Sequence, residues 1–315
     1  MKLDPASKPA REPERKRAPA AATEPPDRLS LLLRRFRLRA RLLHNGRLDG
    51  RSHCGSAPGR ACLHVLRRGA ASVRHGRQRG VAPVLVLREP ALLLYARPLA
   101  HEFVAQGPDG ADWTCAALEF DGAPHNPIVE SLPALVCVPL ARIDGLQPTL
   151  DLLFAETDRA RCGSAVLAER LFEVVVIQLL RWVLDHPAEV GIGGGMVAGL
   201  ADARLARAIV AMHGEPARDW SLGALAAVAA MSRSAFAAGF RQATGVTPAR
   251  YLGDWRLCLA ATLLREGRPL KRIAEEVGFA SAASLSRAFR RRYGAGPRQW
   301  GAGAADAADA GLPRP

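Results

Sequence analysis

An internal duplication in the last third of the chain constrains its fold more than any other feature of the sequence. When the sequence is aligned with itself at an offset of 49 residues, similar residues coincide at regular intervals. The matched pairs are Ser232 with Ser281, Phe236 with Leu285, Phe240 with Phe289, Gly245 with Gly294, Pro248 with Pro297 and Tyr251 with Trp300. Upstream, Leu225-Ala226 corresponds to Ile273-Ala274, with one extra residue in the second turn. This self-similarity predicts one supersecondary unit used twice.

Each unit has the pattern of two short helices joined by a tight turn, over residues 222–241 and 271–293. Ser232 and Ser281 are suited to cap the second helix of each unit, and Gly278 permits a left-handed turn. The residues expected in the two cores are Leu225, Ala226, Met231, Phe236, Phe240, Ile273, Ala274, Gly278, Phe279, Leu285 and Phe289. Small residues let the paired helices cross closely, as in a helix-turn-helix.

A longer helix is predicted between the units. Thr247-Pro248 is a favourable start, and the apolar stripe from Leu252 to Leu263 continues up to Gly267. A helix of about 18 residues spans roughly 27 Å. Recognition helices held at its two ends would reach successive major grooves, which are about 34 Å apart. We therefore expect one chain to read two grooves.

Residues 201–302 resemble the DNA-binding domain of the AraC/XylS family of transcription regulators. The stretches WSLGALAAVAAMSRSAFAAGFRQATGVTPARYLGDWRLCLAATLL and IAEEVGFASAASLSRAFRRRYGAGPRQW carry the resemblance. It implies an all-α C-terminal domain, double-stranded DNA as partner, and RNA polymerase as a further candidate partner. Activation and repression both stay open, although activation is the outcome we assign first.

The faces of the two recognition helices opposite their phenylalanines are expected to contact DNA. The predicted contact residues are Arg233, Ser234, Ala237, Ala238, Arg241, Lys271, Ala282, Ala283, Ser286, Arg287, Arg290 and Arg291. Arg287 is the strongest candidate for reading a base, because a guanidinium can donate two hydrogen bonds to guanine. Arg292 joins the cations expected on phosphates. The family usually has arginine where this chain has Ala238, so we expect the second unit to discriminate bases more strongly.

The charge of the chain agrees with a polyanionic partner. The formal net charge is +14, and residues 201–302 contribute +9 of it, from 16 Arg and Lys against 7 Asp and Glu. The sequence has no apolar run long enough for a membrane span and no apolar signal core, so we predict a cytoplasmic protein without a membrane partner. The scattered cysteines indicate reduced thiols.

The N-terminal part predicts a separate domain. Residues 1–27 and 303–315 are expected to be disordered tails, residues 28–186 an effector and dimerisation domain, and residues 187–200 a Gly-rich linker. Short apolar runs at 61–66, 83–87, 91–95, 101–105 and 113–120 favour an antiparallel β barrel or sandwich. Helices are expected at 127–132, 148–156 and 164–186. The arginine-rich segment 28–47 is either an amphipathic helix or a helix that runs into a first strand.

This domain resembles the cupin-type sensor domain of one branch of the same family. DRLSLLL and FDGAPHNPIVESLPALVCVPL carry the resemblance. The expected fold class is thus α+β and multidomain, with a cupin-like β barrel followed by helices and an all-α tandem helix-turn-helix domain. His53, His64 and His101 lie in or near predicted strands, but the chain has no His-x-His pair. We therefore predict no metal, no cofactor and no catalytic residues.

Two sensing modes stay open for the N-terminal domain. A barrel that encloses an unknown small-molecule effector is one, and oxidation of Cys54, Cys62 or Cys115 is the other. The stripe Leu167, Leu171, Val174, Val175, Gln178 and Trp182 is either core packing or the helix of a homodimer. A metal-dependent dioxygenase or isomerase and a non-specific DNA-coating protein are the competing functions, and neither fits the motifs as well as a regulator does.

Overall fold

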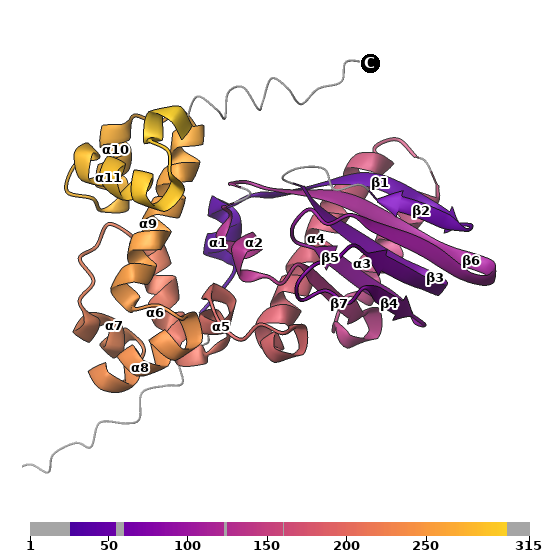
Figure 1. The fold of residues 1–315 in the computed structure, drawn as a ribbon, viewed down its shortest axis with the longest axis horizontal. Coiled ribbons are helices and arrows are strands. Elements are labelled where there is room, and N and C mark those ends of the chain that lie inside the picture. The colour runs from indigo at the N-terminus through magenta and orange to yellow at the C-terminus, as the bar shows by residue number, and fades with distance from the viewer. Residues whose placement is uncertain (1–25, 55–59, 123–124, 160, 301–315) are drawn as a thin grey trace, which may run out of the picture.

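The computed structural model describes residues 26–54, 60–122, 125–159 and 161–300. The predicted tails lie outside these residues, apart from Pro26 and Asp27. Figure 1 shows a sheet with helices along one side of it, and a helical region made by the last third of the chain. The α+β organisation expected from the sequence is confirmed.

In the part of the chain that the structure describes, the N-terminal domain is built on one antiparallel sheet of seven strands. Its strands are β1 (Leu38–Leu48), β2 (Arg51–Cys54), β3 (Ala61–His75), β4 (Val84–Leu87), β5 (Ala91–Tyr95), β6 (His101–Phe120) and β7 (Leu135–Pro139). The order is β1-β6-β3-β5-β7, with β2 also paired to β6 and β4 to β3. The expected runs 101–105 and 113–120 belong to the single strand β6, while β1, β2 and β7 add strands beyond the five expected runs.

A sharp corner in β3 and β6 curls this sheet. The register of the two strands shifts between Leu66 and Arg68 and again between Gly69 and Ala70. Gly69 has φ +83°, and a Cβ there would lie 2.4 Å from the carbonyl oxygen of Gly110. Gly110 itself has φ +66°. The two halves of the sheet can fold toward each other because glycine alone fits both the left-handed backbone and the close approach.

Among the described residues, the N-terminal domain also has a 3-10 helix (Leu140–Arg142) and the α-helices α1 (Ser30–Arg35), α2 (Pro127–Ser131), α3 (Gln147–Asp158) and α4 (Ser164–Asp185). For the arginine-rich segment, the second alternative is the one observed, since α1 runs into β1. The predicted stripe on α4 divides into two groups. Leu171, Val175 and Trp182 are buried, whereas Leu167 and Val174 are exposed. Core packing therefore explains only part of the stripe.

The segment expected to be a Gly-rich linker contains more regular structure than the sequence indicated. A 3-10 helix covers Pro187–Val190, and α5 covers Met196–Ala201, with only 191–195 left between them. Val197 and Leu200 are buried, and α5 packs on α6 and α8. The prediction of a linker over all of 187–200 needs correction, because apolar residues after the glycines pack into the core.

The C-terminal region consists of α6 (Ala203–Gly214), α7 (Leu222–Val228), α8 (Arg233–Thr244), α9 (Pro248–Arg265), α10 (Leu270–Val277) and α11 (Ala282–Tyr293). Helix α9 has 18 residues, and Thr247 caps its start by accepting a hydrogen bond from the backbone N–H of Arg250. Figure 1 shows α7 and α8 toward one end of α9 and α10 and α11 toward the other. Within the described residues, no single helix has the length and apolar character to cross a membrane; the bent pair α7–α8 meets those two criteria only jointly.

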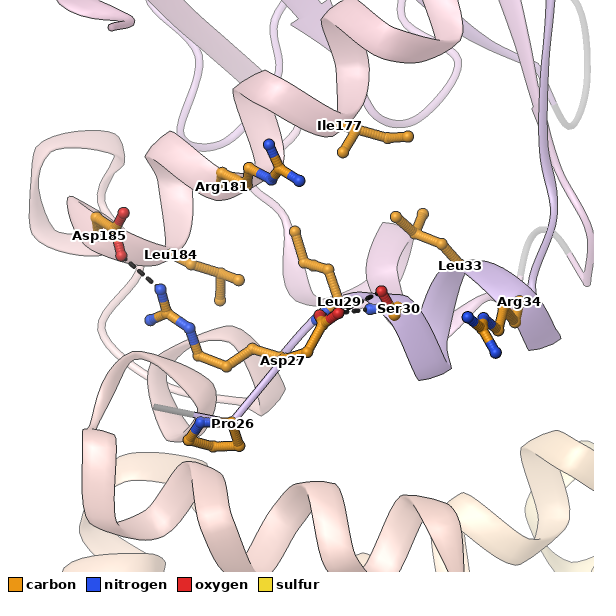
Figure 2. Close-up of a pocket in the computed structure, with 11 residues that line it drawn as sticks. Pro26, Asp27, Leu29, Ser30, Leu33, Arg34, Ile177, Arg181, Leu184 and Asp185 are labelled. Atoms are coloured by element: carbon orange, nitrogen blue, oxygen red, sulfur yellow. Dashed lines mark hydrogen bonds and ion pairs between the residues drawn. The ribbon is translucent and has the colours of Figure 1, made fainter. Parts of the chain in front are cut away.

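The first helix of the N-terminal domain lies beside α4 and reaches the C-terminal region. Asp27 accepts hydrogen bonds from the backbone N–H groups of Leu29 and Ser30, so it holds the start of α1. Arg28 forms an ion pair of 2.6 Å with Asp185 at the end of α4 (Figure 2). At the other end of α1, the ring of Phe36 meets the ring of Trp255 on α9 edge to face, with centroids 5.6 Å apart.

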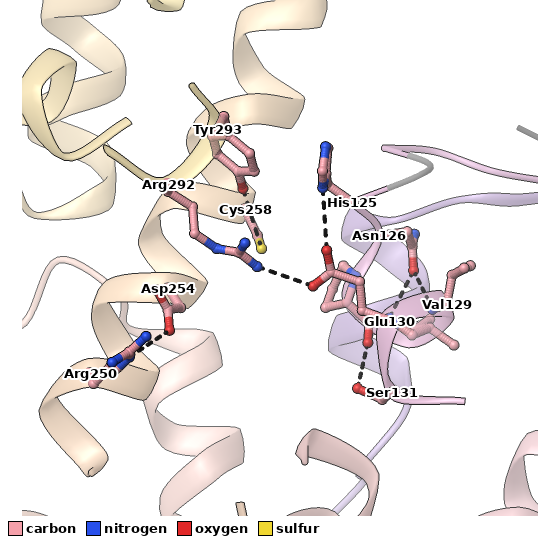
Figure 3. Close-up of polar contacts among 12 residues, drawn as sticks. His125, Asn126, Val129, Glu130, Ser131, Arg250, Asp254, Cys258, Arg292 and Tyr293 are labelled. Carbon is pink, nitrogen blue, oxygen red and sulfur yellow. Dashed lines mark hydrogen bonds and ion pairs between the residues drawn. The ribbon is translucent and has the colours of Figure 1, made fainter. Parts of the chain in front are cut away.

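Helix α2 makes a second contact with the C-terminal region. Asn126 caps α2 by accepting hydrogen bonds from the N–H groups of Ile128 and Val129. This cap positions Glu130, which forms a 3.3 Å ion pair with Arg292 of α11 (Figure 3). Glu130 also lies 3.3 Å from His125 Nδ1. The side of α2 that carries Glu130 thus faces the second helix pair.

Candidate DNA-binding surface

The first helix pair, α7 and α8, is held by a tight turn. The two helices form an angle of 84°, close to that of helix-turn-helix motifs. The backbone N–H of Met231 donates to the carbonyl of Ala226 at 2.9 Å, which closes the turn. Ser232 then caps α8 by accepting from the N–H of Ala235. Phe236 and Phe240 are fully buried, so the opposite side of α8 is free to face a partner.

The second pair, α10 and α11, repeats these features. The backbone N–H of Phe279 donates to the carbonyl of Ala274 at 2.8 Å, and this bond corresponds to the one from Met231 in the first pair. Ser281 and Ser284 form a reciprocal capping box at the start of α11. Leu285 and Phe289 are fully buried. The two repeats therefore share the turn hydrogen bond and the serine cap, and α11 adds the reciprocal bond to Ser284.

The turns differ at the residue that adopts the left-handed conformation. It is Gly278 in the second pair, with φ +83°, and Ala230 in the first, with φ +53°. Among the described residues, Ala230 is the only residue other than glycine with positive φ. A Cβ in this conformation costs roughly 1–2 kcal/mol.

We expect Ala230→Gly to raise the free energy of unfolding by about 0.5–1 kcal/mol. The gain is smaller than the strain it removes because glycine has more freedom in the unfolded chain. Urea unfolding of the full chain measures it, with Ala227→Gly, at an exposed helical position, as the matched control that should destabilise. Equal destabilisation by both substitutions would contradict the strain at Ala230.

None of the residues predicted to contact DNA is buried. Arg233, Ser234, Ala238 and Arg241 are exposed on α8, and Arg287, Arg290, Ala283 and Arg291 are exposed on α11. Lys271 is exposed on α10, while Ala237, Ala282 and Ser286 are half-buried. Of the predicted core residues, Met231, Gly278 and Phe279 are half-buried in the turns, and the other eight are fully buried.

The arginines of this surface differ in how they are held. Within the described part of the chain, Arg287 has no hydrogen bond, ion pair or ring contact, so its guanidinium is free for a base edge. Arg233 packs over Gly223, where a Cβ would lie 3.0 Å from its Nε. Arg292 was expected on phosphate, but in this structure it is paired with Glu130. That expectation is corrected: Arg292 lies at the domain interface because α2 places a carboxylate beside it.

Several residues that support the surface had not been singled out from the sequence. Arg256 of α9 donates hydrogen bonds to the carbonyls of Pro216 and Arg218, at 2.7 and 3.1 Å. A Cβ on Gly278 would lie 2.6 Å from Ala217 Cα, so this glycine also lets the same loop approach. In the sequence, the only signal for the role of Arg256 in holding this loop was its position between the apolar residues of α9.

An aromatic stack joins α6 to α9. The ring of His213 stacks on Trp255 with centroids 3.7 Å apart, and its Nε2 lies 2.9 Å from the hydroxyl of Tyr251. Burial lowers the pKa of His213 to about 3 and raises that of Tyr251, so both stay neutral at physiological pH. The stack fixes the middle of α9, from which both helix pairs extend.

The N-terminal domain contains a cavity of about 260 Å³ on the inner side of the curled sheet. Its lining combines apolar, histidine and cysteine side chains: Leu43, His44, Leu48, Ser52, His53, Cys54, Cys62, His64, Phe103, Trp113 and Cys115. All three predicted redox thiols are therefore in one place. Burial raises the pKa of Cys54 to about 11, raises that of Cys62, and raises that of Cys115 well above the ordinary value. These thiols are protonated at neutral pH, which lowers their reactivity toward oxidants.

Comparisons with known proteins agree with this architecture. Residues 27–185 match the family model described as cupin, and residues 225–302 match one described as helix-turn-helix domain. The chain is 36% identical over 203 residues to a putative AraC-like transcription regulator of Streptomyces antibioticus, covering 63% of this chain and 66% of the relative. It is 38% identical over 174 residues to another of Streptomyces lividans, covering 54% and 56%. The aligned part thus spans less than two thirds of either relative.

One similar solved structure is the DNA-binding domain of AdpA in complex with a target DNA. It is 30% identical to this chain and covers 34% of this chain and 96% of the other, with a TM-score of 0.31.

Proposed function

The chain belongs to the AraC-type transcription regulators with an N-terminal cupin domain, and from this premise we propose that it binds specific DNA sites through two successive major grooves. The observation that carries the proposal is the pair of matching helix pairs on one 18-residue helix, α9. A helix of that length spans roughly 27 Å, close to the spacing of about 34 Å between successive grooves once the recognition helices add their own width.

The charges on these helices support a division of roles. Arg287 is exposed without a partner among the described residues, and its geometry suits two hydrogen bonds to guanine. Arg233, Arg241, Lys271, Arg290 and Arg291 carry the phosphate contacts, which position the protein without reading sequence. In the first pair, Ser234, Ala237 and Ala238 offer a hydroxyl and methyl groups only. Sequence discrimination therefore lies mostly in α11.

DNA binding responds to an effector in the cavity of the N-terminal domain. The support is the direct contact between the two parts of the molecule: Phe36 against Trp255, and Glu130 against Arg292. A ligand that shifts β6 or the loop into α2 changes the position of Glu130 and thereby the second helix pair. Small-molecule binding is favoured over thiol oxidation, since burial keeps the three thiols protonated.

The remaining parts of the function follow from family and surface. The protein works in the cytoplasm as a one-component regulator and forms a homodimer through the exposed residues of α4. Leu167 and Val174, together with the exposed Val166, are the apolar side chains available for that contact. RNA polymerase is a further partner if the outcome is activation.

Hydroxyl-radical footprinting of the full-length protein on an operator obtained by binding-site selection tests the two-groove proposal. We expect protection on one face of the duplex over two successive grooves for each chain. A footprint confined to one groove would refute the proposal. Uniform protection along DNA of any sequence would also refute it and would favour the non-specific DNA-coating alternative.

A further inference from the structure

Three side chains with metal-binding atoms meet inside the curled sheet. They are Cys54 of β2, His64 of β3 and His101 of β6, and one ligand atom from each lies within 4.8 Å of the other two. Both histidines are buried and Cys54 is half-buried. This group departs from our sequence-based prediction of no metal site, which considered only local His-x-His spacing.

The corner of the sheet explains how these residues come together. Cys54 lies directly opposite His101 in the pairing of β2 with β6, and His75 lies opposite His101 on the β3 side. His64 is on the same strand as His75, and an extended strand would separate the two by about 36 Å. The bend at Gly69 returns the first half of β3 over the second, so that the rings of His64 and His75 are 4.9 and 6.4 Å from the ring of His101.

The outer nitrogens of both rings already have partners. His101 Nδ1 donates to the carbonyl of Leu99 at 2.7 Å, which leaves a lone pair on Nε2. This Nε2 lies 3.0 Å from Nε2 of His64. The other nitrogen of His64, Nδ1, lies 2.9 Å from Cys115 Sγ. Metal-binding histidines typically have their second nitrogen held by a backbone carbonyl or similar group, and His101 has this arrangement. In the metal-free protein His64 Nε2 donates to His101 Nε2, so on coordination the His64 proton moves to Nδ1, which then donates to Cys115 Sγ.

The His101 ring is also fixed from its flat side. Tyr95 stacks on it with ring centroids 4.0 Å apart and planes at 7°, and the hydroxyl of Tyr95 lies 2.7 Å from His75 Nε2. A ring held in this way loses little freedom on coordinating an ion, because its orientation is set before the ion arrives.

We propose that Cys54, His64 and His101 bind a thiophilic transition-metal ion, for which Zn²⁺ is the probe. In a tetrahedral zinc site, two imidazole nitrogens lie about 3.3 Å apart and a nitrogen and a sulfur about 3.6 Å apart. The observed nitrogen separation is 3.0 Å, and the three ligand atoms lie within 4.8 Å of one another, so the two nitrogens separate slightly and the Cys54 sulfur closes to about 3.6 Å on coordination. On binding, the Cys54 thiol loses its proton to solvent and the thiolate coordinates the ion.

Three protein ligands leave a fourth position open, as in zinc sites that exchange a ligand. Cys54 and His64 also line the 260 Å³ cavity, so this position is available to a molecule inside it. The inference therefore names the chemistry of the sensing cavity, and its regulatory meaning rests on the proposed function. Coordination would join β2, β3 and β6 at one point.

The test uses the full-length protein after chelator treatment and dialysis under reducing conditions. Zn²⁺ binding is measured by competition with a chromophoric chelator, and Co²⁺ is added separately to detect the charge-transfer absorption of a cobalt–thiolate bond. The variants are Cys54→Ser and His101→Gln, and the matched control is Cys137→Ser, a half-buried thiol of β7 outside the group. Circular dichroism checks that each variant is folded.

We expect one Zn²⁺ per wild-type chain, a loss of affinity of about tenfold or more in Cys54→Ser and His101→Gln, and wild-type binding in Cys137→Ser. Cobalt–thiolate absorption should disappear only in Cys54→Ser. The site would be overturned if the wild-type protein bound less than one Zn²⁺ per chain, or if the folded Cys54→Ser variant kept the cobalt–thiolate absorption unchanged. DNA binding measured on the same samples keeps this result separate from the proposed function. If the wild-type protein binds DNA but takes up no metal ion, only the metal site is refuted. If it takes up the metal ion but does not bind DNA, only the proposed regulator function is refuted.

Discussion

Replacing Gly69 by alanine is expected to destabilise the protein by about 3 kcal/mol. The left-handed backbone at φ +83° accounts for part of this cost. The rest comes from the new Cβ, which would lie 2.4 Å from the carbonyl oxygen of Gly110 and 3.1 Å from Ala111 Cα. Both neighbours are backbone atoms of β6, so neither can rotate away, and the corner of the sheet must open.

Gly50→Ala is the matched control for this prediction. Gly50 has the same φ of +83°, but nothing lies within 4 Å of its Cβ position. Gly50→Ala should lower the free energy of unfolding by only about 1–2 kcal/mol, the cost of the left-handed backbone conformation. Guanidinium unfolding of both variants separates the two contributions. Equal free energies of unfolding for Gly69→Ala and Gly50→Ala would show that the close approach to Gly110 has no energetic weight.

The second large effect is expected at Arg287. Arg287→Ala should weaken binding to the preferred operator by about 1–3 kcal/mol and remove discrimination at one base position. The reason is the loss of two hydrogen bonds to guanine. Stability should change little, because Arg287 is exposed and has no partner among the described residues.

Lys271→Ala provides the comparison for Arg287→Ala. Lys271 is an exposed cation on α10, so its removal should weaken all sequences alike and reduce the salt dependence by about one phosphate contact. Equilibrium titrations at fixed salt, on the operator and on single-base variants, distinguish the two patterns. If Arg287→Ala also weakens every sequence by the same factor, Arg287 contacts phosphate and does not read a base.

The helical region was predictable from sequence because its determinants are local. Serine caps, a left-handed glycine and phenylalanines at helical spacing all act over one or two helical turns. The duplication places equivalent residues in both repeats. The structure accordingly buries Phe236, Phe240, Leu285 and Phe289. The local pattern could not predict the partner of each cation. In the sequence Arg292 resembles its neighbours Arg290 and Arg291, yet it forms an ion pair with Glu130, which is far upstream in the chain.

The sheet domain was predictable only in outline for a related reason. Alternating apolar runs indicated strands, but periodicity carries no information on a bend within a strand, so the long β6 was divided in two. The meeting of Cys54, His64 and His101 depends on the corner at Gly69 and Gly110, two glycines that resemble any others in the sequence. Residues 191–200 show the opposite effect: glycines indicated a linker, while Val197 and Leu200 pack into the core.

The spacing of the two half-sites in the operator tests the central claim most directly. With α9 as a rigid connection, the two recognition helices of one chain must enter grooves on the same face of the duplex. Inserting about half a helical turn, roughly 5 base pairs, between the half-sites should reduce the affinity of the full-length protein about tenfold or more and leave a single-groove footprint. Unchanged affinity with both grooves still protected would contradict the account.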